Sequence, residues 1–255
     1  MSSQKPNVSA VLITLNAAAH LSECLAGLKW CDEIVVLDGG STDATEKICR
    51  EFGARVHTEL RWQGFGVQKN RAVALASSEW VFSVDADEIC GPELRAEIER
   101  ALADAGNTVA FEMPRSSSFC GHWMRHGGWW PDYVTRLFRR GSARFSDDVV
   151  HERLIVEGVT QRLQEPLLHY TYDTMAQALE KQDRYSTLGA QKAFEQGQRA
   201  TPFSALTHGL WTFLRTYFLR LGLLDGRAGW MLANYNARTT YLRYLKLWRL
   251  GQTRR

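Results

Sequence analysis

The sequence predicts an α/β fold of the Rossmann-like kind, in which helices flank a mostly parallel sheet, followed by a C-terminal amphipathic helical region. Short apolar runs alternate with helical patterns between residues 9 and 84, as they do in parallel sheets. After residue 170 the patterns are helical only, and they become basic. We therefore expect two regions, residues 1–170 with the sheet and residues 171–255 with the helices.

Each expected element in the first half has its own signal. The second apolar run ends at Asp38, and the turn after it starts a helix that Ser41 or Thr42 would cap and Gly53 would end. The run that begins at Trp80 opens on large apolar side chains, as a buried strand does. The expected strands cover residues 9–15, 33–37, 54–57 and 80–84, and the expected helices cover residues 17–28, 41–52 and 67–76.

The second half is less regular. Pro92 suits the first turn of a helix, and the alternation that begins at Thr108 predicts a strand. Residues 116–123 have no clear period, and residues 127–132 form a loop rich in aromatic side chains. Further strands are expected at residues 108–115, 133–139 and 167–170, and helices at residues 92–105, 175–196, 209–224 and 238–249.

Three carboxylates, Asp85, Asp87 and Glu88, lie within four residues directly after a buried strand. On a continuing strand Asp85 and Asp87 would share a face, because alternate residues do. Acids this close repel one another unless a positive charge lies among them. Mg2+ and Mn2+ commonly bind one or two carboxylates together with substrate phosphates. The alternative is a simple turn, with Glu88 in the first turn of a helix.

Polar side chains follow three of the expected strands: Asn16, Asp38, and the pair Asp85 and Asp87. Because neighbouring parallel strands end at the same edge of a sheet, and ligands bind beyond that edge, these positions predict a shared ligand site. Their alternative role is to cap turns.

Charge is distributed unevenly along the 255 residues. From Thr201 onward there are eight arginines and one lysine but a single acid, Asp225. Because the whole chain carries +3, the residues before Thr201 must carry −5. The basic end predicts contact with an anionic surface, either membrane or nucleic acid. The apolar run at 8–15 is too short for a signal peptide or membrane span, and the five cysteines are not spaced as pairs, so we expect reduced thiols and a cytoplasmic protein.

Several motifs together resemble those of family 2 glycosyltransferases of the GT-A fold, over roughly residues 8–170. These motifs are LITLN at 12–16, LDGGSTD at 37–43, QKNR at 68–71 and VDADE at 84–88. The chain is also similar to bacterial lipopolysaccharide core-biosynthesis β-1,4-glucosyltransferases, in HGGWWP at 126–131, RLFRR at 136–140, VHE at 150–152 and LHYTY at 168–172. The resemblance implies inverting transfer of a hexose, glucose above all, from a UDP-sugar to a heptose of the lipopolysaccharide inner core, with Mg2+ or Mn2+ as cofactor.

The resemblance also implies a donor site. Asn16 and Asp38 would hydrogen-bond the uracil, and Lys69 and Arg71 would lie near the nucleotide, where cations offset phosphate charge. Asp85 would contact the ribose or the metal. The alternative for Lys69 and Arg71 is an exposed helix face, the commoner place for such side chains.

For the metal, the resemblance implies that Asp87 holds the ion against the diphosphate, with Asp85 beside it. His169 is the candidate ligand from the opposite side, although it also suits a half-buried, hydrogen-bonded role. Arg136 would lie near the acceptor or the diphosphate.

An inverting transfer needs a base that takes the proton of the attacking hydroxyl. The VHE segment points to Glu152, and because the family's usual Glu-Asp pair is absent, Asp148 is the second candidate. His151 would orient Glu152, bind phosphate or lie at the surface. Trp129 and Trp130 would form a platform for the acceptor sugar, or else fill the core at a tight turn.

The helices expected after residue 209 combine apolar, aromatic and basic side chains, as interfacial membrane helices do. Each cation near an anionic membrane contributes on the order of 1 kcal/mol. We therefore expect a peripheral protein on the inner face of the cytoplasmic membrane, acting on a lipid-linked core oligosaccharide. The alternative is that these helices pack on the sheet region or on a second subunit.

Other classes of function are less favoured by the sequence. Nucleic-acid binding by the basic end leaves the acids at 84–88 unexplained, so no nucleic-acid partner is expected. A non-catalytic membrane-surface adaptor would bind UDP without turnover. Within the enzymes, the alternatives are another nucleotide-sugar donor or a different acceptor such as a polyprenyl phosphate.

Overall fold

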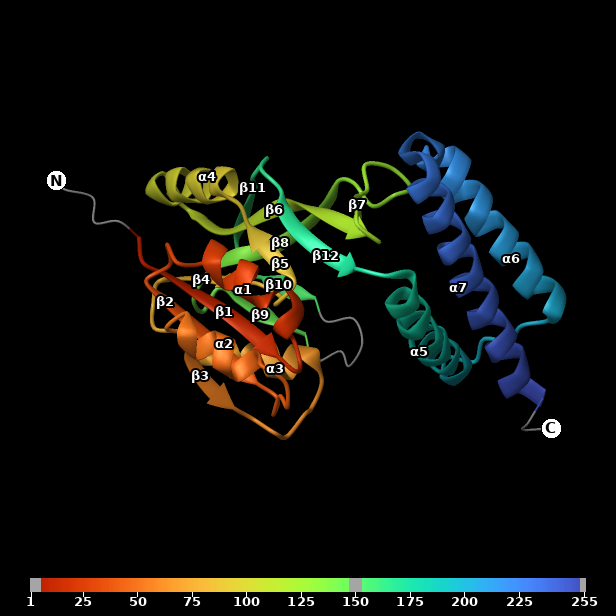
Figure 1. Cartoon of the computed structure of the whole chain (residues 1–255), viewed down its shortest axis with the longest axis horizontal. Coiled ribbons are helices and arrows are strands. Elements are labelled where there is room, and N and C mark those ends of the chain that lie inside the picture. Colours follow the sequence, from red (N-terminus) through yellow and green to blue (C-terminus); the bar gives the residue numbers. More distant parts are fainter. Residues whose placement is uncertain (1–5, 147–152, 253–255) are drawn as a thin grey trace. The chain divides into compact units, whose positions relative to one another are not determined.

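The computed structural model describes residues 6–146 and 153–252 (Figure 1). It divides into two compact units. The first is formed by the chain up to Arg115 together with Tyr133–His169, and the second by Ser116–Asp132 together with the chain from Tyr170 onward.

The parallel half of the sheet lies in the first unit. Its strands are β1 (Val8–Thr14), β2 (Glu33–Asp38), β3 (Arg55–Thr58) and β4 (Trp80–Ser83), in the order β3-β2-β1-β4. Helices α1 (Ala18–Gly27), α2 (Thr45–Glu51) and α3 (Phe65–Ala74) connect them. Thr14 pairs with Asp38, and Val11 pairs with Ser83, so β2, β1 and β4 bring their carboxyl ends to one edge. The predicted α/β fold with parallel strands is confirmed.

The sheet continues beyond β4 with antiparallel pairing to β8, and its order there is β4-β8-β6-β12-β5. The added strands are β5 (Glu88–Cys90), β6 (Thr108–Phe119), β8 (Asp132–Arg139) and β12 (Leu167–Tyr172), with β7 (His122–Trp123) and β11 (Val159–Arg162) beside β6. Helix α4 (Pro92–Ala103) follows β5, and β9 (Ala143–Phe145) pairs with β10 (Leu154–Val156) in a separate small sheet.

Both faces of the parallel sheet are buried. Along β1, Val8, Ala10 and Leu12 belong to one buried cluster, whereas Val11 belongs to another. This follows from the period of two in a strand. The first cluster includes Leu21 and Leu25 of α1 and Ile98 of α4, and the second includes Ala72 of α3. Near-continuous apolar runs are therefore required in β1 and β2, as strands covered on both faces need them.

Some local predictions were wrong. Helix α2 begins at Thr45, and neither Ser41 nor Thr42 caps it, because both side chains hydrogen-bond within the preceding turn or to Asn16 instead. Strand β6 runs on to Phe119, past the predicted end at residue 115. The short strands β5, β7, β9, β10 and β11 were not predicted, since two to four residues are too few for a period to show.

The α-helices described in the second unit are α5 (Met175–Glu195), α6 (Pro202–Leu214) and α7 (Gly226–Gln252). A capping box between Thr201 and Ser204 starts α6. The predicted helix over 209–224 is broken: α6 gives way to a π-helical turn, η1 (Arg215–Leu219), and a 3-10 turn, η2 (Gly222–Asp225). Leu221 has a φ of 56°, which an α-helix excludes. Among the described residues, no helix has the length and apolar character needed to cross a membrane.

Candidate active site

The acid-rich segment forms a turn, so the condition under which Asp85 and Asp87 would share a face, a continuing strand, is not met. Strand β4 ends at Ser83, and the backbone N–H of Glu88 donates to the carbonyl of Asp85 at 2.9 Å. The N–H of Asp85 in turn donates to Oε2 of Glu88 at 3.0 Å. Glu88 does not begin a helix; it is the first residue of β5 and is fully buried. Its carboxylate therefore lies beneath the turn and fixes its shape.

Side-chain cations neutralise Asp85 and Glu88 within the protein. Lys69 of α3 places Nζ 2.9 Å from Oδ1 of Asp85. Arg136 of β8 places Nη2 2.5 Å from Oδ2 of Asp85 and 2.6 Å from Oε1 of Glu88. Arg115 of β6 lies 3.5 Å from the same Glu88 oxygen. The repulsion expected among the acids is thus offset by three cations from three elements.

This arrangement fixes the charge of Asp85. Burial alone raises the pKa of a carboxyl group, but Arg136 and Lys69 outweigh it and hold the pKa of Asp85 well below its usual range. Burial likewise lowers the pKa of a guanidinium, yet Asp85 and Glu88 raise the pKa of Arg136 above its ordinary value. Both groups therefore stay charged throughout the physiological range.

Asp87 faces a different partner. Its Oδ2 lies 3.8 Å from Nε2 of His169, in the middle of β12, and the side chain of Asp87 is 39% exposed. Burial lowers the pKa of His169 to about 4, so the imidazole is neutral near pH 7. A carboxylate suits Mg2+ and Mn2+, and a neutral imidazole suits transition-metal ions.

The spacing of this pair suits one ion. Mg2+ holds its ligands at about 2.0–2.1 Å in an octahedron, so two ligand atoms lie about 3 Å apart when adjacent and about 4 Å apart when opposite. The 3.8 Å between Asp87 and His169 is close to the separation of opposite ligands. In the described part of the chain, no group of three or more His, Cys, Asp or Glu side chains is placed to hold an ion. The remaining ligands would have to come from phosphate oxygens and water, as is usual for Mg2+.

The turns after β1 and β2 are held to each other. Asp38 accepts four hydrogen bonds: from Oγ1 of Thr14, from the N–H of Gly40, and from both the N–H and the Oγ of Ser41. These donors outweigh burial and lower the pKa of Asp38. Asn16 accepts from the N–H and Oγ1 of Thr42. Both predicted nucleotide ligands thus also shape the turns, as the alternative interpretation expected.

The two predicted cations of α3 have different surroundings. Lys69 is 6% exposed and pairs with Asp85, whereas Arg71 turns toward the loop before the helix. The guanidinium of Arg71 donates to the carbonyl of Arg61 and to Gln68, and lies 3.7 Å from Glu59. Only Lys69 therefore reaches the acid cluster.

The candidate bases Asp148 and Glu152, together with His151, lie outside the described residues. The chain shortly before these candidates is anchored to α3 by two hydrogen bonds. The N–H of Phe145 donates to Oδ1 of Asn70 at 2.8 Å, and Nδ2 of Asn70 donates to the carbonyl of Phe145 at 2.9 Å. The ring of Phe145 also lies 5.4 Å from Nζ of Lys69. The end of β9 is thereby held beside the cation that pairs with Asp85.

The two tryptophans of the aromatic loop belong to the second unit and differ from each other. Trp129 packs edge-on against Phe119, with ring centroids 5.6 Å apart, and joins a buried cluster there. Trp130 lies beside Arg125, whose guanidinium carbon is 5.1 Å from the ring centre, and it lines a pocket. Trp129 is thus largely a packing residue, and Trp130 is the one that a ligand can contact.

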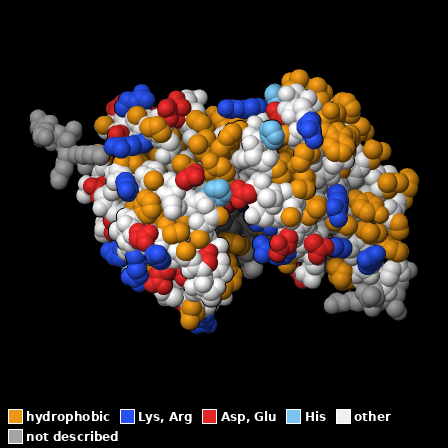
Figure 2. Space-filling model, viewed as in Figure 1, with side chains coloured by type: hydrophobic (Ala, Val, Ile, Leu, Met, Phe, Trp, Pro, Cys, Tyr) orange, Lys and Arg blue, Asp and Glu red, His pale blue; other side chains and the backbone are white. Residues whose placement is uncertain are grey.

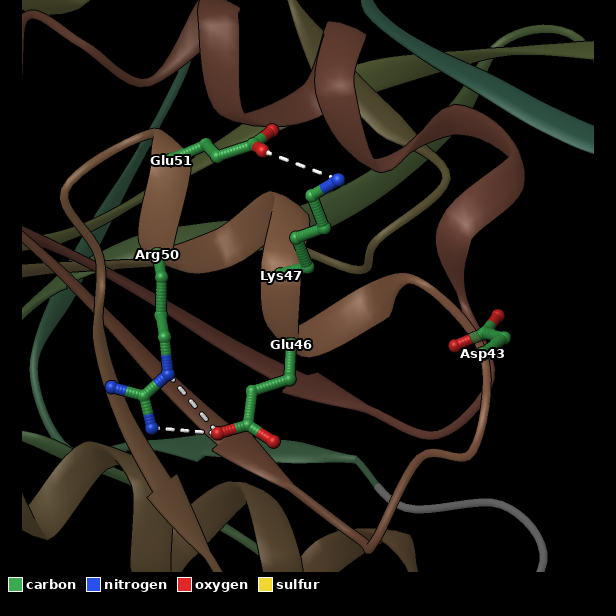
Figure 3. Close-up of a pocket in the computed structure, with 5 residues that line it drawn as sticks. All are labelled: Asp43, Glu46, Lys47, Arg50 and Glu51. Atoms are coloured by element: carbon green, nitrogen blue, oxygen red, sulfur yellow. Dashed lines mark hydrogen bonds and ion pairs between the residues drawn. The ribbon is translucent and has the colours of Figure 1, made fainter.

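A hollow of 620 Å³ on α2 contains none of the predicted site residues (Figure 3). Its charged side chains pair along the helix, Arg50 with Glu46 and Lys47 with Glu51, and Asp43 precedes them. Such exposed i, i+4 pairs stabilise a helix weakly and point to no ligand.

Sequence reasoning missed Glu88 and Arg115 as parts of the site. Glu88 was noticed only as an acid of the turn, and Arg115 only as the end of a strand. The signal for Glu88 was available, because a third carboxylate at the end of a buried strand needs its own cation. Nothing in the sequence pairs Arg115 with it, since 27 positions separate the two.

A sheet whose carboxyl edge gathers an acid–cation cluster and an Asp–His pair is an α/β fold with a candidate ligand site at that edge. The family follows from the sequence. Residues 9–163 match the model of glycosyl transferase family 2, and the chain belongs to that family. The predicted family and its GT-A type of α/β fold are confirmed.

Full-length relatives agree. The chain is 32% identical over 253 residues to the lipopolysaccharide core biosynthesis glycosyltransferase LpsC of Rhizobium meliloti (strain 1021), covering 94% of this chain and 92% of LpsC. It is 28% identical to an uncharacterized glycosyltransferase of Rickettsia felis, covering 94% and 89%. Among solved structures, glucosyl-3-phosphoglycerate synthase from Mycobacterium tuberculosis overlaps 42% of this chain and 43% of its own, at 27% identity and a TM-score of 0.38.

Proposed function

We propose that this glycosyltransferase is an inverting, metal-dependent hexosyltransferase that moves glucose from a UDP-sugar to a heptose of a lipid-linked lipopolysaccharide inner core. It would work in the cytoplasm, on the inner face of the cytoplasmic membrane. LpsC, named for lipopolysaccharide core biosynthesis, supports this class of acceptor. The choice of glucose and heptose follows from the resemblance of the segments at 126–131 and 150–152.

The observation that carries the proposal is the separation of roles between the two aspartates. Asp85 is held by Lys69 and Arg136, and Asp87 faces His169 at 3.8 Å. In the proposed site Asp87 and His169 hold Mg2+ or Mn2+, and Asp85 meets the ribose or the metal. When bound, the ion stabilises the charge that develops on the departing diphosphate.

The nucleotide end of the site would be built by the turns after β1 and β2. Asn16 uses its Oδ1 on Thr42, and among the described residues its Nδ2 has no hydrogen-bond partner, so this amide can donate to a uracil carbonyl. Asp38 keeps the turn at Gly40 and Ser41 in place beside it. Arg136 would act on the diphosphate through Asp85.

The proposed base is Glu152, with Asp148 as the second candidate. The base takes the proton of the acceptor hydroxyl while that oxygen attacks the anomeric carbon and the bond to the diphosphate breaks. His151 would orient the carboxylate. The anchor of Phe145 on α3, next to Lys69, supports this role because the second candidate, Asp148, follows three residues later in the chain.

The acceptor would be held by the second unit. Trp130 offers an aromatic face to a sugar, and the basic C-terminal helices would attach the enzyme to an anionic membrane surface, where a lipid-linked acceptor lies. No nucleic acid is needed for this chemistry.

The direct test measures UDP release with UDP-glucose, UDP-galactose and UDP-N-acetylglucosamine, with and without EDTA, using a heptose-containing core lipid as acceptor. We expect release with UDP-glucose that EDTA abolishes, and we expect Asp87→Ala to lose it. Release of UDP with another donor would mean that the enzyme transfers that sugar and not glucose. UDP release that persists in EDTA would contradict the proposed dependence on a metal ion.

A calorimetric titration with UDP and Mn2+ separates the remaining outcomes. UDP binding without turnover on any donor would point to another acceptor or to an adaptor. A folded protein that binds no UDP would contradict the proposed donor.

A further inference from the structure

The second unit presents a continuous apolar face. On α6 it follows one helical stripe, with Phe203 74% exposed, Leu206 60% and Leu210 58%, and it continues through η1 and η2. Figure 2 shows hydrophobic side chains gathered over this part of the molecule. We call this set the apolar face: Phe203, Leu206, Leu210, Trp211, Leu214, Phe218, Leu219, Leu221 and Leu224.

A pocket of 430 Å³ opens at the end of this face. It lies between the loop 125–131 and the junction of η1 and η2, within the second unit. Leu219 and Leu221 belong both to the apolar face and to the pocket lining, and Arg220 lies between them. The opposite wall carries Arg125 and Trp130. A basic pocket thus adjoins an apolar surface.

The loop wall is fixed by Asp225, the only acid from Thr201 onward. Its carboxylate accepts from the N–H of Arg125 at 3.2 Å, and from both the N–H and Nδ1 of His126 at 2.8 Å each. The N–H of Gly127 donates to the carbonyl of Arg220 at 2.8 Å, which ties the two walls together. The carboxylate of Asp225 is therefore occupied by backbone and imidazole groups and does not pair with either guanidinium.

Within residues 6–146 and 153–252, no carboxylate neutralises the two guanidiniums of the pocket. Among the described residues, neither Arg125 nor Arg220 forms an ion pair, in contrast to Arg136 in the first unit. The side chain of Arg220 lies so close to Gly128 that a Cβ there would be 2.3 Å from its Nη1. The missing side chain at Gly128 is therefore what leaves room for this arginine. Two arginines in one hollow favour a shared anion, and their forked geometry suits phosphate.

We propose that this pocket holds the phosphate group of an anionic membrane lipid while the apolar face enters the interface of the bilayer. This inference rests on the membrane association in the proposed function, and it names the lipid group that is recognised. A lipid phosphate lies at the depth where interfacial helices place their polar edge. Leu219 and Leu221 would enter the lipid beside the phosphate that Arg125 and Arg220 bind.

The test is co-sedimentation of the full chain with phosphatidylcholine vesicles with and without phosphatidic acid. The sharpest variants change no charge. Gly128→Ala displaces Arg220, whereas Gly121→Ala has nearly the same backbone strain, with a φ of 82° against 85°, and meets nothing within 4 Å. We expect Gly128→Ala to weaken binding to the phosphatidic acid vesicles about tenfold, the usual effect of losing a charge-assisted contact, and Gly121→Ala to leave it within about twofold.

A charge-matched pair supports the same test. Arg220→Gln and Arg227→Gln remove the same charge, but the exposed Arg227 does not line the pocket. We expect the larger loss from Arg220→Gln. Equal losses of vesicle binding in Arg220→Gln and Arg227→Gln, or no loss in Gly128→Ala, would overturn the proposal that this pocket binds the lipid phosphate. Vesicle binding would then come from the general positive charge of the C-terminal helices.

Free phosphate is the remaining source of the same chemistry. We expect inorganic phosphate, added at constant ionic strength, to compete with the vesicles for the unchanged protein. Binding of inorganic phosphate without any preference for phosphatidic acid vesicles would overturn the lipid as the ligand. UDP binding should be unchanged in every variant. A result that contradicts the proposed donor site can therefore be distinguished from one that contradicts the lipid-binding pocket.

Discussion

Glu88 and Arg136 form a buried ion pair within the first unit. Oε1 of Glu88 lies 2.6 Å from Nη2 of Arg136, and the two side chains are 0% and 9% exposed. The other Glu88 oxygen accepts from the N–H of Asp85, and Arg136 also binds the Asp85 side chain. This pair therefore sets both the backbone and the charge of the turn that carries the proposed metal ligand.

Removing one partner of this pair should destabilise the fold. Glu88→Ala leaves Arg136 and Arg115 without their shared carboxylate and the Asp85 N–H without its acceptor, so the free energy of unfolding should fall by about 3–5 kcal/mol. Denaturant unfolding followed by tryptophan fluorescence measures it. Asp87→Asn is the control, because Asp87 is 39% exposed and its loss should cost less than about 1 kcal/mol. A loss of similar size in both variants would show that Glu88 has no special structural role.

We expect His169 to contribute to the binding of the metal ion. His169→Ala should weaken Mn2+ binding, measured by calorimetry in the presence of UDP, by about tenfold or more, as the loss of a ligand does. Asp104→Asn changes an exposed acid at the end of α4 and should have no effect on Mn2+ binding. If His169→Ala binds Mn2+ like the unchanged protein, the histidine is a packing residue and the ion must be held from another side.

Lys69 and Arg71, the two cations of α3, should differ in their effect on UDP binding. Lys69→Gln removes a partner of Asp85, so UDP binding should weaken about tenfold or more, the usual effect of losing a charge-assisted contact. Arg71→Gln removes the same charge from the same helix, but the contacts that it removes are those of Arg71 with residues 59–68. UDP binding should therefore change less than about twofold. Titration of UDP into both variants measures the difference. The reverse ranking would place the nucleotide on the Arg71 side of the helix.

The sequence predicted those parts of the structure that depend on local patterns. The apolar runs of β1, β2 and β4 and the polar residues at their ends were enough to predict a parallel sheet and a site at its carboxyl edge. The contacts of Arg115 and Arg136 with Glu88 join residues 27 and 48 positions apart, which no local pattern reveals. The break at Leu221 was equally hidden, because an apolar stripe has the same period whether or not one residue adopts a positive φ.

Asp38 should make stability depend on pH in acid. Its four hydrogen bonds lower its pKa in the folded state below the usual value of about 3.9, so its contribution is complete above that pH and is lost as the pH falls through the lower folded value. Asp38→Ala removes charge-assisted bonds and should reduce the free energy of unfolding at pH 7 by about 1.5–3 kcal/mol. Below about pH 4 the gap between the two proteins should narrow, since the Asp38 carboxyl takes up a proton there in the unfolded chain, and at a lower pH in the folded protein. Urea unfolding at pH 7, 5 and 3 checks this, with Asp104→Asn as the exposed control. A gap that stays constant down to pH 3 would mean that the turn is held by contacts other than the charge of Asp38.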